Sequence, residues 1–210
     1  MALALVGFLY VAWTGAWIIE RALEPHALWM TTREGRVAYW LVARLLLWVP
    51  PAVVLIRASG RSFRLVMGLG RTRQILVWGG GTGLMLGAIT VAVKVMGHQP
   101  LFASPPGLPF LSGVFIAPVV EEIVFRGAVL GALNARCRFG AANTVTALLF
   151  LGAHFPGWFF QGCLLENLKD PVGGAFSIFL LGWLFGYVTH KSRSVAAGTV
   201  SHVLNNLFNS

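Results

Sequence analysis

Acidic residues are scarce in this sequence, and so is charge of either sign. Seven residues are Asp or Glu, against sixteen Lys and Arg, and charged residues make up only 11% of the 210-residue chain. A soluble domain normally carries about 25% charged residues. In this chain 57% of the residues are hydrophobic and the mean hydropathy is +0.75. A chain of this composition exposes apolar side chains that lipid solvates better than water. The composition therefore predicts an integral membrane protein and excludes an ordinary soluble domain.

Cysteine is nearly absent too, which excludes a disulfide-stabilised fold. We expect the two cysteines, Cys137 and Cys163, to lie on opposite sides of the membrane and to remain unpaired. The formal charge of +9 does not indicate nucleic-acid binding, because the basic residues cluster in loops between apolar runs. Such loops face anionic lipid. The predicted partner is thus the lipid bilayer, and no nucleic acid is expected.

Long apolar segments set the expected architecture. Seven of them can cross about 30 Å of hydrocarbon: 3–19, 37–56, 75–96, 110–131, 142–160, 172–189 and 195–209. Each must be helical, because lipid offers no partner for a free backbone N–H group. We predict an all-α fold, a polytopic membrane bundle of about seven transmembrane helices (six to eight), forming a single transmembrane domain over 1–210. Three spans without motifs would fill 1–96, and a catalytic four-helix core would fill 110–209.

Basic residues are unevenly divided between the two ends of these helices. Nine lie in connections on one side of the predicted topology: Arg57, Arg61, Arg64, Arg71, Arg73, Arg136, Arg138, Lys191 and Arg193. The opposite connections carry four: Arg21, Arg33, Arg36 and Lys169. The positive-inside rule then places the N-terminus in the cytoplasm.

Two glutamates near the middle of the fourth predicted span call for an explanation. A charge at the centre of a spanning helix costs about 2.5–3.5 kcal/mol on insertion scales. Glu122 and Arg126 are four residues apart, so they can neutralise one another on one helix face. Glu121 lies about 100° away around the helix and faces a different neighbour. A purely structural ion pair would account for Glu122 and Arg126 but not for Glu121.

Other polar residues lie in the fifth and the last predicted spans. His154 follows Phe150 by one helical turn, and His202 and Asn206 share one face of the final helix. Each could merely provide hydrogen bonds between helices. With Glu121, however, they supply a carboxylate and a histidine to activate water, and a histidine and a carboxamide to stabilise an oxyanion. This combination predicts amide hydrolysis without a covalent intermediate.

In chain order the three segments read EEIVFR, FLGAH and HVLNN. They resemble the motifs EExxxR, FxxxH and HxxxN of the CAAX-protease and bacteriocin-processing family, once called the abortive-infection family. The resemblance covers about 110–209 and implies a membrane-embedded peptidase of the glutamate type. The roles it implies are water activation by Glu121 and His154, oxyanion stabilisation by His202 and Asn206, and support from Glu122 and Arg126.

The resemblance also implies a class of substrate. Members of the family include prenyl-protein endopeptidases, bacteriocin self-immunity and maturation proteins, and exosortase-like or myxosortase-like enzymes that trim C-terminal membrane anchors. It therefore implies a membrane-anchored or lipidated protein or peptide as partner, cut near its C-terminus, and no cofactor. The shortness of the chain favours the bacterial processing members, so the resemblance implies a location in a bacterial inner (plasma) membrane.

Other interpretations stay open on the sequence alone. A zinc-dependent membrane protease could use the same residues as ligands, although HExxH is absent and Asn is a poor zinc ligand. A transporter or proton relay also hides carboxylates and histidines, but no inverted repeat is visible. A non-catalytic immunity protein would only bind a partner. Arg44, in the second predicted span, is expected to reach the interface or pack structurally, with a contact to the glutamates or a substrate carboxylate as the alternative.

Overall fold

The computed structural model describes residues 2–101 and 105–210, and helices make up most of this part of the chain. The longer helices are α1 (Ala2–Leu23), α2 (Arg33–Ala58), α5 (Gly81–Met96), α9 (Phe139–Gly152), α12 (Ala175–Ser192) and α13 (Val195–Asn209). The shorter ones are η1 (Leu28–Thr31), α3 (Phe63–Met67), α4 (Thr72–Gln74), η2 (Ile75–Gly80), α6 (Leu108–Leu111), η3 (Ser112–Ile116), α7 (Ala117–Glu122), η4 (Ile123–Leu130), α8 (Gly131–Asn134), α10 (Phe155–Phe160) and α11 (Leu164–Lys169). The predicted all-α bundle is confirmed.

Among the described residues, four helical segments are long and apolar enough to cross a membrane: Ala2–Leu23, Arg33–Ala58, Thr72–Met96 and Leu108–Asn134. They coincide with the first four predicted spans. The fourth runs from α6 to α8 and widens into π-helical turns in η3 and η4, on either side of the predicted glutamates. The helices α12 and α13 match the last two predicted segments, while the total number of spans stays a prediction.

The fifth predicted span, 142–160, is wrong as a single continuous helix. α9 ends at Gly152 and α10 begins at Phe155, with a turn between them. Pro156 accounts for a missing helical hydrogen bond at this point, because it has no N–H group to donate to the carbonyl of Gly152. The break places His154 at the start of α10 instead of inside a regular helix.

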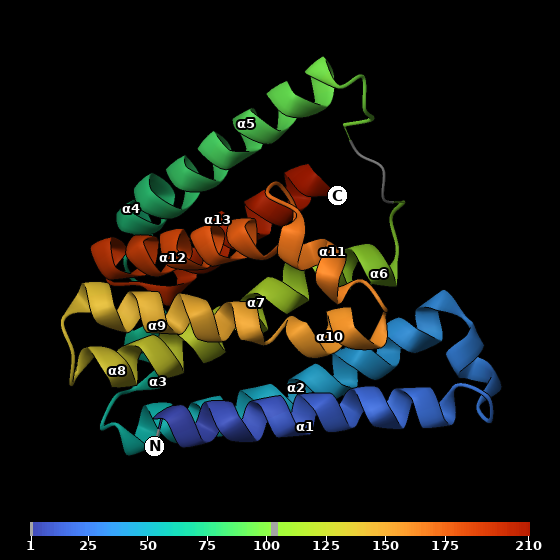
Figure 1. Cartoon of the computed structure of the whole chain (residues 1–210). Helices are drawn as coiled ribbons and strands as arrows, with labels where there is room; N and C mark the ends of the chain where they lie inside the picture. Colours follow the sequence, from blue (N-terminus) through green and yellow to red (C-terminus); the bar gives the residue numbers. More distant parts are fainter. Residues whose placement is uncertain (1, 102–104) are drawn as a thin grey trace.

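Figure 1 shows how the helices are arranged around the central segment. α1 and α2 lie side by side at one edge of the bundle, α9 and α12 lie across its middle, and α5 lies at the opposite edge. α12 packs against α9 and α13, and α13 packs in turn against α5. The main cluster of buried hydrophobic side chains joins α1 and α2 to α7 and η4. Both N-terminal helices thus cover the segment that carries the glutamates.

A row of glycines, each four residues from the next, lets the third span approach α13 closely. Gly79 lies against the backbone of Ala197, and Gly83 and Gly87 lie against side chains of the same helix. A Cβ atom at Gly79 would come within 2.6 Å of the Ala197 carbonyl oxygen. Small residues with this spacing allow close packing between membrane helices. The row therefore fixes the third span against the helix that carries His202.

Candidate active site

Glu122 and Arg126 form the ion pair that their spacing predicts. Nη1 of Arg126 lies 3.1 Å from Oε1 of Glu122, and both side chains are fully buried. Nη2 of Arg126 donates a hydrogen bond of 2.7 Å to the carbonyl oxygen of Gly182 in α12, and the guanidinium lies over the ring of Phe150. Because an isolated charge at this depth would be strongly destabilising, the pair is a fixed part of the helix packing.

His202 lies between the two glutamates. Its Nδ1 atom is 3.1 Å from Oε1 of Glu122, and its Nε2 atom is 3.9 Å from Oε2 of Glu121. The ring stacks on Phe185, with the two centroids 4.6 Å apart. Since an ionised carboxylate can only accept hydrogen bonds, we assign the Nδ1 proton to the hydrogen bond with Glu122. Nε2 is then the ring nitrogen nearer to Glu121.

Glu121 has a further basic neighbour, which comes from the N-terminal half of the chain. Nη2 of Arg44 lies 3.7 Å from Oε1 of Glu121, and its guanidinium lies near the rings of Trp13 and Trp48. The expectation that Arg44 extends to the interface is therefore wrong, and the alternative contact with the glutamates is present. No motif in α2 points to this pairing, because it joins helices that are distant in sequence. The only signal was an arginine inside an apolar span.

A cavity of about 180 Å³ brings Glu121 and His154 together beside Arg44. Its wall is largely aromatic and includes four tryptophans that sequence reasoning missed: Trp13, Trp17, Trp48 and Trp158. The indole N–H groups of Trp17 and Trp48 and the Nε–H of Arg44 are buried without a hydrogen-bond partner among the described residues. Buried donors of this kind are costly when unpaired. The cavity therefore suits water or a ligand that brings acceptor atoms.

The end of α9 holds His154 in place. Its Nδ1 atom is 3.0 Å from the carbonyl oxygen of Phe150, one turn earlier, and the Phe150 ring meets the imidazole edge-on. A carbonyl can only accept a hydrogen bond, so Nδ1 carries the proton and Nε2 of the neutral ring keeps a lone pair. The neutral His154 ring thus has a proton acceptor at Nε2.

Asn206 follows His202 by one helical turn on α13. Its Nδ2 group donates a hydrogen bond of 3.0 Å to the carbonyl oxygen of Gly113 in η3. It lines a different pocket, of about 290 Å³, together with Gly113 and Val114. Five of the predicted residues are therefore linked by contacts or by a shared cavity. Asn206 instead lines the neighbouring pocket of about 290 Å³. The five are Glu121, Glu122, Arg126, His154 and His202.

The zinc alternative requires at least three ligands that converge on one point. Within residues 2–101 and 105–210, no group of three or more His, Cys, Asp or Glu side chains is arranged to hold a metal ion. The carboxylates of Glu121 and Glu122 instead face the guanidinium groups of Arg44 and Arg126. These residues do not fit a zinc site in the arrangement observed.

Comparison with known protein families gives a match to the C-terminal half of the chain. The sequence profile of the type II CAAX prenyl endopeptidase Rce1-like family matches residues 103–208, half of the chain, a range that includes all six predicted site residues. Comparisons with curated proteins and with solved structures find no significant match. The resemblance to the CAAX-protease family is thereby confirmed, while membership in the bacterial C-terminal sorting group stays a prediction. The chain belongs to the type II CAAX prenyl endopeptidase Rce1-like family, and so to the membrane peptidases.

Proposed function

We propose that this protein hydrolyses a peptide bond near the C-terminus of a membrane-anchored or lipidated protein, with Glu121 and His154 activating the attacking water. The observation that carries this proposal is the shared cavity of about 180 Å³, which Glu121 lines from α7 and His154 from the turn between α9 and α10. A water held between the two side chains would have two proton acceptors within reach. No metal ion is needed for this step.

The proposed reaction uses one water and forms no bond to the enzyme. The water oxygen attacks the carbonyl carbon of the scissile peptide, and one water proton passes to Glu121. The tetrahedral intermediate then collapses as the C–N bond breaks and Glu121 returns that proton to the leaving amine. The second water proton leaves with the new carboxyl group, which ionises. His154 accepts a hydrogen bond from the water and orients it for attack.

We assign stabilisation of the oxyanion to His202, with Asn206 as the second donor. Nε2 of His202 lies on the Glu121 side of the ring. Because the Nδ1–H is directed to Glu122, Nε2 can donate a hydrogen bond only when the ring is an imidazolium. Asn206 would have to exchange its hydrogen bond with Gly113 for one with the substrate. Its role therefore requires a side-chain rotation when the substrate binds.

The wall of the cavity supports a peptide as the substrate. Trp17, Trp48 and Arg44 offer buried N–H groups without partners among the described residues, and backbone carbonyls or a C-terminal carboxylate would supply the acceptors. The aromatic rings would cover apolar side chains of the same peptide.

We propose further that the protein resides in a bacterial inner membrane with its N-terminus in the cytoplasm. Membrane-anchored substrates would then reach the enzyme by diffusion within the bilayer.

The test is a cleavage assay in liposomes with tagged, membrane-anchored substrates, one series prenylated and one carrying a plain transmembrane anchor. Mass spectrometry of the shortened product would locate the cut. Glu121→Gln and His154→Ala each remove a proton acceptor, so cleavage should fall by about 10²–10⁴-fold. Glu166→Gln and His26→Ala remove the same kinds of group from exposed positions and should cleave like wild type.

Folding of each variant is checked by its elution as a single species and by its helical circular dichroism. If the folded Glu121→Gln and His154→Ala variants both retain wild-type activity, the proposed mechanism is overturned. A folded wild-type enzyme that cleaves neither substrate series would overturn the proposed substrate class.

A further inference from the structure

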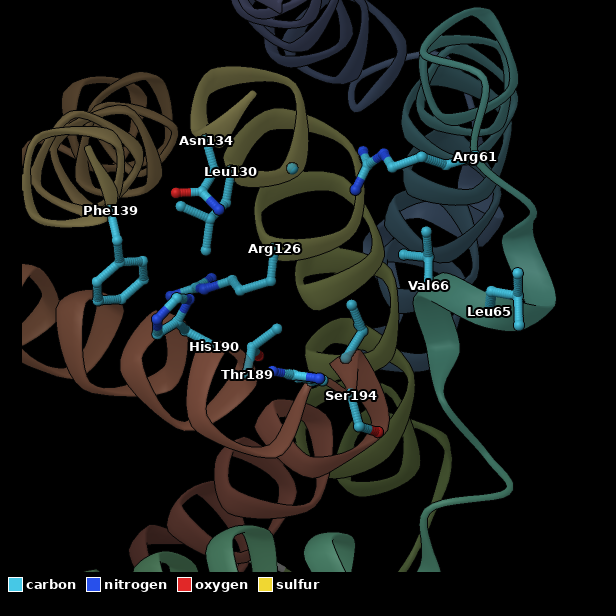
Figure 2. A pocket seen from close by; sticks show the side chains of 13 residues that line it. Arg61, Leu65, Val66, Arg126, Leu130, Asn134, Phe139, Thr189, His190 and Ser194 are labelled. Carbon is cyan, nitrogen blue, oxygen red and sulfur yellow. The ribbon is translucent and has the colours of Figure 1, made fainter. Parts of the chain in front are cut away.

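A second pocket lies at the end of the bundle where three connections meet. It has a volume of about 230 Å³ and lies beside the connections between α2 and α3, α8 and α9, and α12 and α13, with η4 also contributing to its wall. Figure 1 places all three connections at the same end of the molecule. Figure 2 shows the lining side chains in a ring, with Arg61 on one side and Phe139 and His190 on the other. Residues far apart in sequence thus build this pocket.

The wall of this pocket carries positive charge that is not balanced. Arg61, Arg126 and Arg193 line it; Glu122 neutralises Arg126, but no acidic side chain is among the described lining residues to neutralise Arg61 or Arg193. The connections 57–74, 134–140 and 190–194 contain nine Lys and Arg and no Asp or Glu. In the described part of the chain, Arg61 and Arg193 take part in no ion pair.

The unneutralised positive charge of Arg61 costs free energy, because the side chain that carries it is half-buried. Its Nη2 group donates a hydrogen bond of 2.8 Å to the carbonyl oxygen of Gly127, but its buried Nε–H has no partner among the described residues. Burial lowers the pKa of the Arg61 guanidinium, the direction expected for a cation withdrawn from water. A nearby anion would offset both the unpaired charge and the unpaired donor.

Deeper in the pocket, two almost fully buried polar groups also lack partners. Arg126 is 2% exposed, and its Nε–H has no hydrogen-bond partner among the described residues. Thr189 is 9% exposed, and its hydroxyl group is likewise unpartnered in the part of the chain that the structure describes. A tetrahedral oxyanion presents several acceptor oxygens at once, so it could pair with guanidinium and hydroxyl donors together.

We propose that this pocket binds a phosphate-class anion, with Arg193 at its exposed side, Arg61 at its wall and Arg126 at its base. Guanidinium groups match phosphate oxygens through paired hydrogen bonds, which favours this ligand over a simple halide. Two sources share this chemistry: the headgroup of an anionic phospholipid and free phosphate. The site is separate from the aromatic cavity, and Arg126, which lines it, is paired with Glu122, the residue that follows Glu121 of that cavity.

The test measures binding, so it does not depend on peptidase activity. The wild-type protein is placed in phosphatidylcholine nanodiscs containing a minority of phosphatidylglycerol, and native mass spectrometry counts the lipids retained. In parallel, calorimetry measures the binding of inorganic phosphate to protein in pure phosphatidylcholine. Arg61→Gln and Arg193→Gln are each expected to weaken binding at least about fivefold. Arg71→Gln, in one of the same connections but outside the pocket wall, should bind like wild type.

Each outcome has a defined meaning. Selective retention of phosphatidylglycerol that is lost in both pocket variants supports a lipid headgroup, and phosphate binding with the same dependence supports a free anion. Arg193 is exposed, so its variant remains informative even if Arg61→Gln fails to fold. The proposal is overturned if neither ligand binds, or if Arg71→Gln weakens binding as much as Arg193→Gln.

Discussion

Oε1 of Glu122 lies 3.1 Å from Nδ1 of His202, although eighty residues separate the two in the chain. The same oxygen lies 3.1 Å from Nη1 of Arg126. One carboxylate oxygen therefore joins the fourth span to the last helix and also neutralises a buried guanidinium. Glu121, the preceding residue, makes longer contacts of 3.7 Å to Arg44 and 3.9 Å to His202. The two adjacent glutamates thus differ in how tightly each is bound.

This difference predicts separate effects on stability for the two carboxylates. Glu122→Gln leaves Arg126 buried without its counter-ion and should lower the free energy of unfolding by about 3–5 kcal/mol. Glu121→Gln should cost clearly less, because its ion pairs are longer and its side chain is partly exposed. Unfolding in mixed micelles of increasing SDS content, followed by tryptophan fluorescence, gives both values. Equal losses for the two variants would contradict the assignment of Glu122 as the structural partner.

Arg44 is predicted to contribute to activity although it lies outside the three motifs. Arg44→Gln leaves Glu121 without its guanidinium partner and should reduce kcat/KM at least about tenfold. Arg44→Lys keeps the charge but loses the planar donor set, so it should retain more activity than the glutamine variant. The liposome assay compares the two, with unfolding curves as the control for folding. Wild-type kinetics in Arg44→Gln would show that the contact is only incidental.

Two neighbouring glycines offer a matched test of helix packing. A Cβ atom at Gly79 would lie 2.6 Å from the carbonyl oxygen of Ala197, whereas nothing lies within 4 Å of one at Gly80. Gly79→Ala should therefore lower the free energy of unfolding by about 1–3 kcal/mol. Gly80→Ala should be neutral or stabilising by up to about 1 kcal/mol, because alanine favours helix. Unfolding by SDS measures both, and the prediction fails if the order is reversed.

The two natural cysteines test the proposed orientation. Figure 1 places the connection between α8 and α9, which holds Cys137, at the opposite end of the bundle from the start of α11, where Cys163 lies. Both are free thiols. In right-side-out vesicles, a membrane-impermeant maleimide should label Cys163 and should label Cys137 only after permeabilisation. The single-cysteine variants Cys137→Ser and Cys163→Ser identify the labelled residue, and the reverse pattern would invert the topology.

Metal independence is the expected outcome of metal removal. Because the described carboxylates of the site face guanidinium groups and the His202 ring, chelators such as 1,10-phenanthroline should leave cleavage unchanged. Elemental analysis of the purified enzyme should give far less than one zinc per chain. Loss of activity on chelation, with recovery on adding zinc, would favour the zinc-dependent alternative.

The sequence predicted those parts of the site whose geometry is local. The pairing of Glu122 with Arg126 follows from helical spacing alone, and so does the different direction of Glu121. The contact between Arg44 and Glu121 is not local, because it depends on how α2 packs against α7, and no periodicity within one helix encodes that packing. The aromatic cavity was missed for the same reason, since its tryptophans come from separate helices.

The break before α10 shows a second limit of reading spans from hydropathy. Residues 142–160 are predominantly apolar, so an averaged hydropathy gives no sign of the turn at His154. Pro156 was the available signal, because a proline cannot donate the helical hydrogen bond. Proline alone is not decisive, however, since α2 continues without interruption through Pro50 and Pro51. Only the surrounding packing distinguishes the two cases.

The hydrogen bond between His154 and the Phe150 carbonyl also limits how the ring can move. If the imidazole flipped, Cδ2–H would replace Nδ1–H next to that carbonyl and the hydrogen bond would be lost, so the ring must keep one orientation from one catalytic cycle to the next. Nε2, the nitrogen that keeps its lone pair, is then held in one direction, so each incoming water meets the same acceptor. The conformational entropy of ordering this ring is lost once, when the protein folds, and not again in every turnover. Alignment of the water would therefore add little to the activation entropy of hydrolysis.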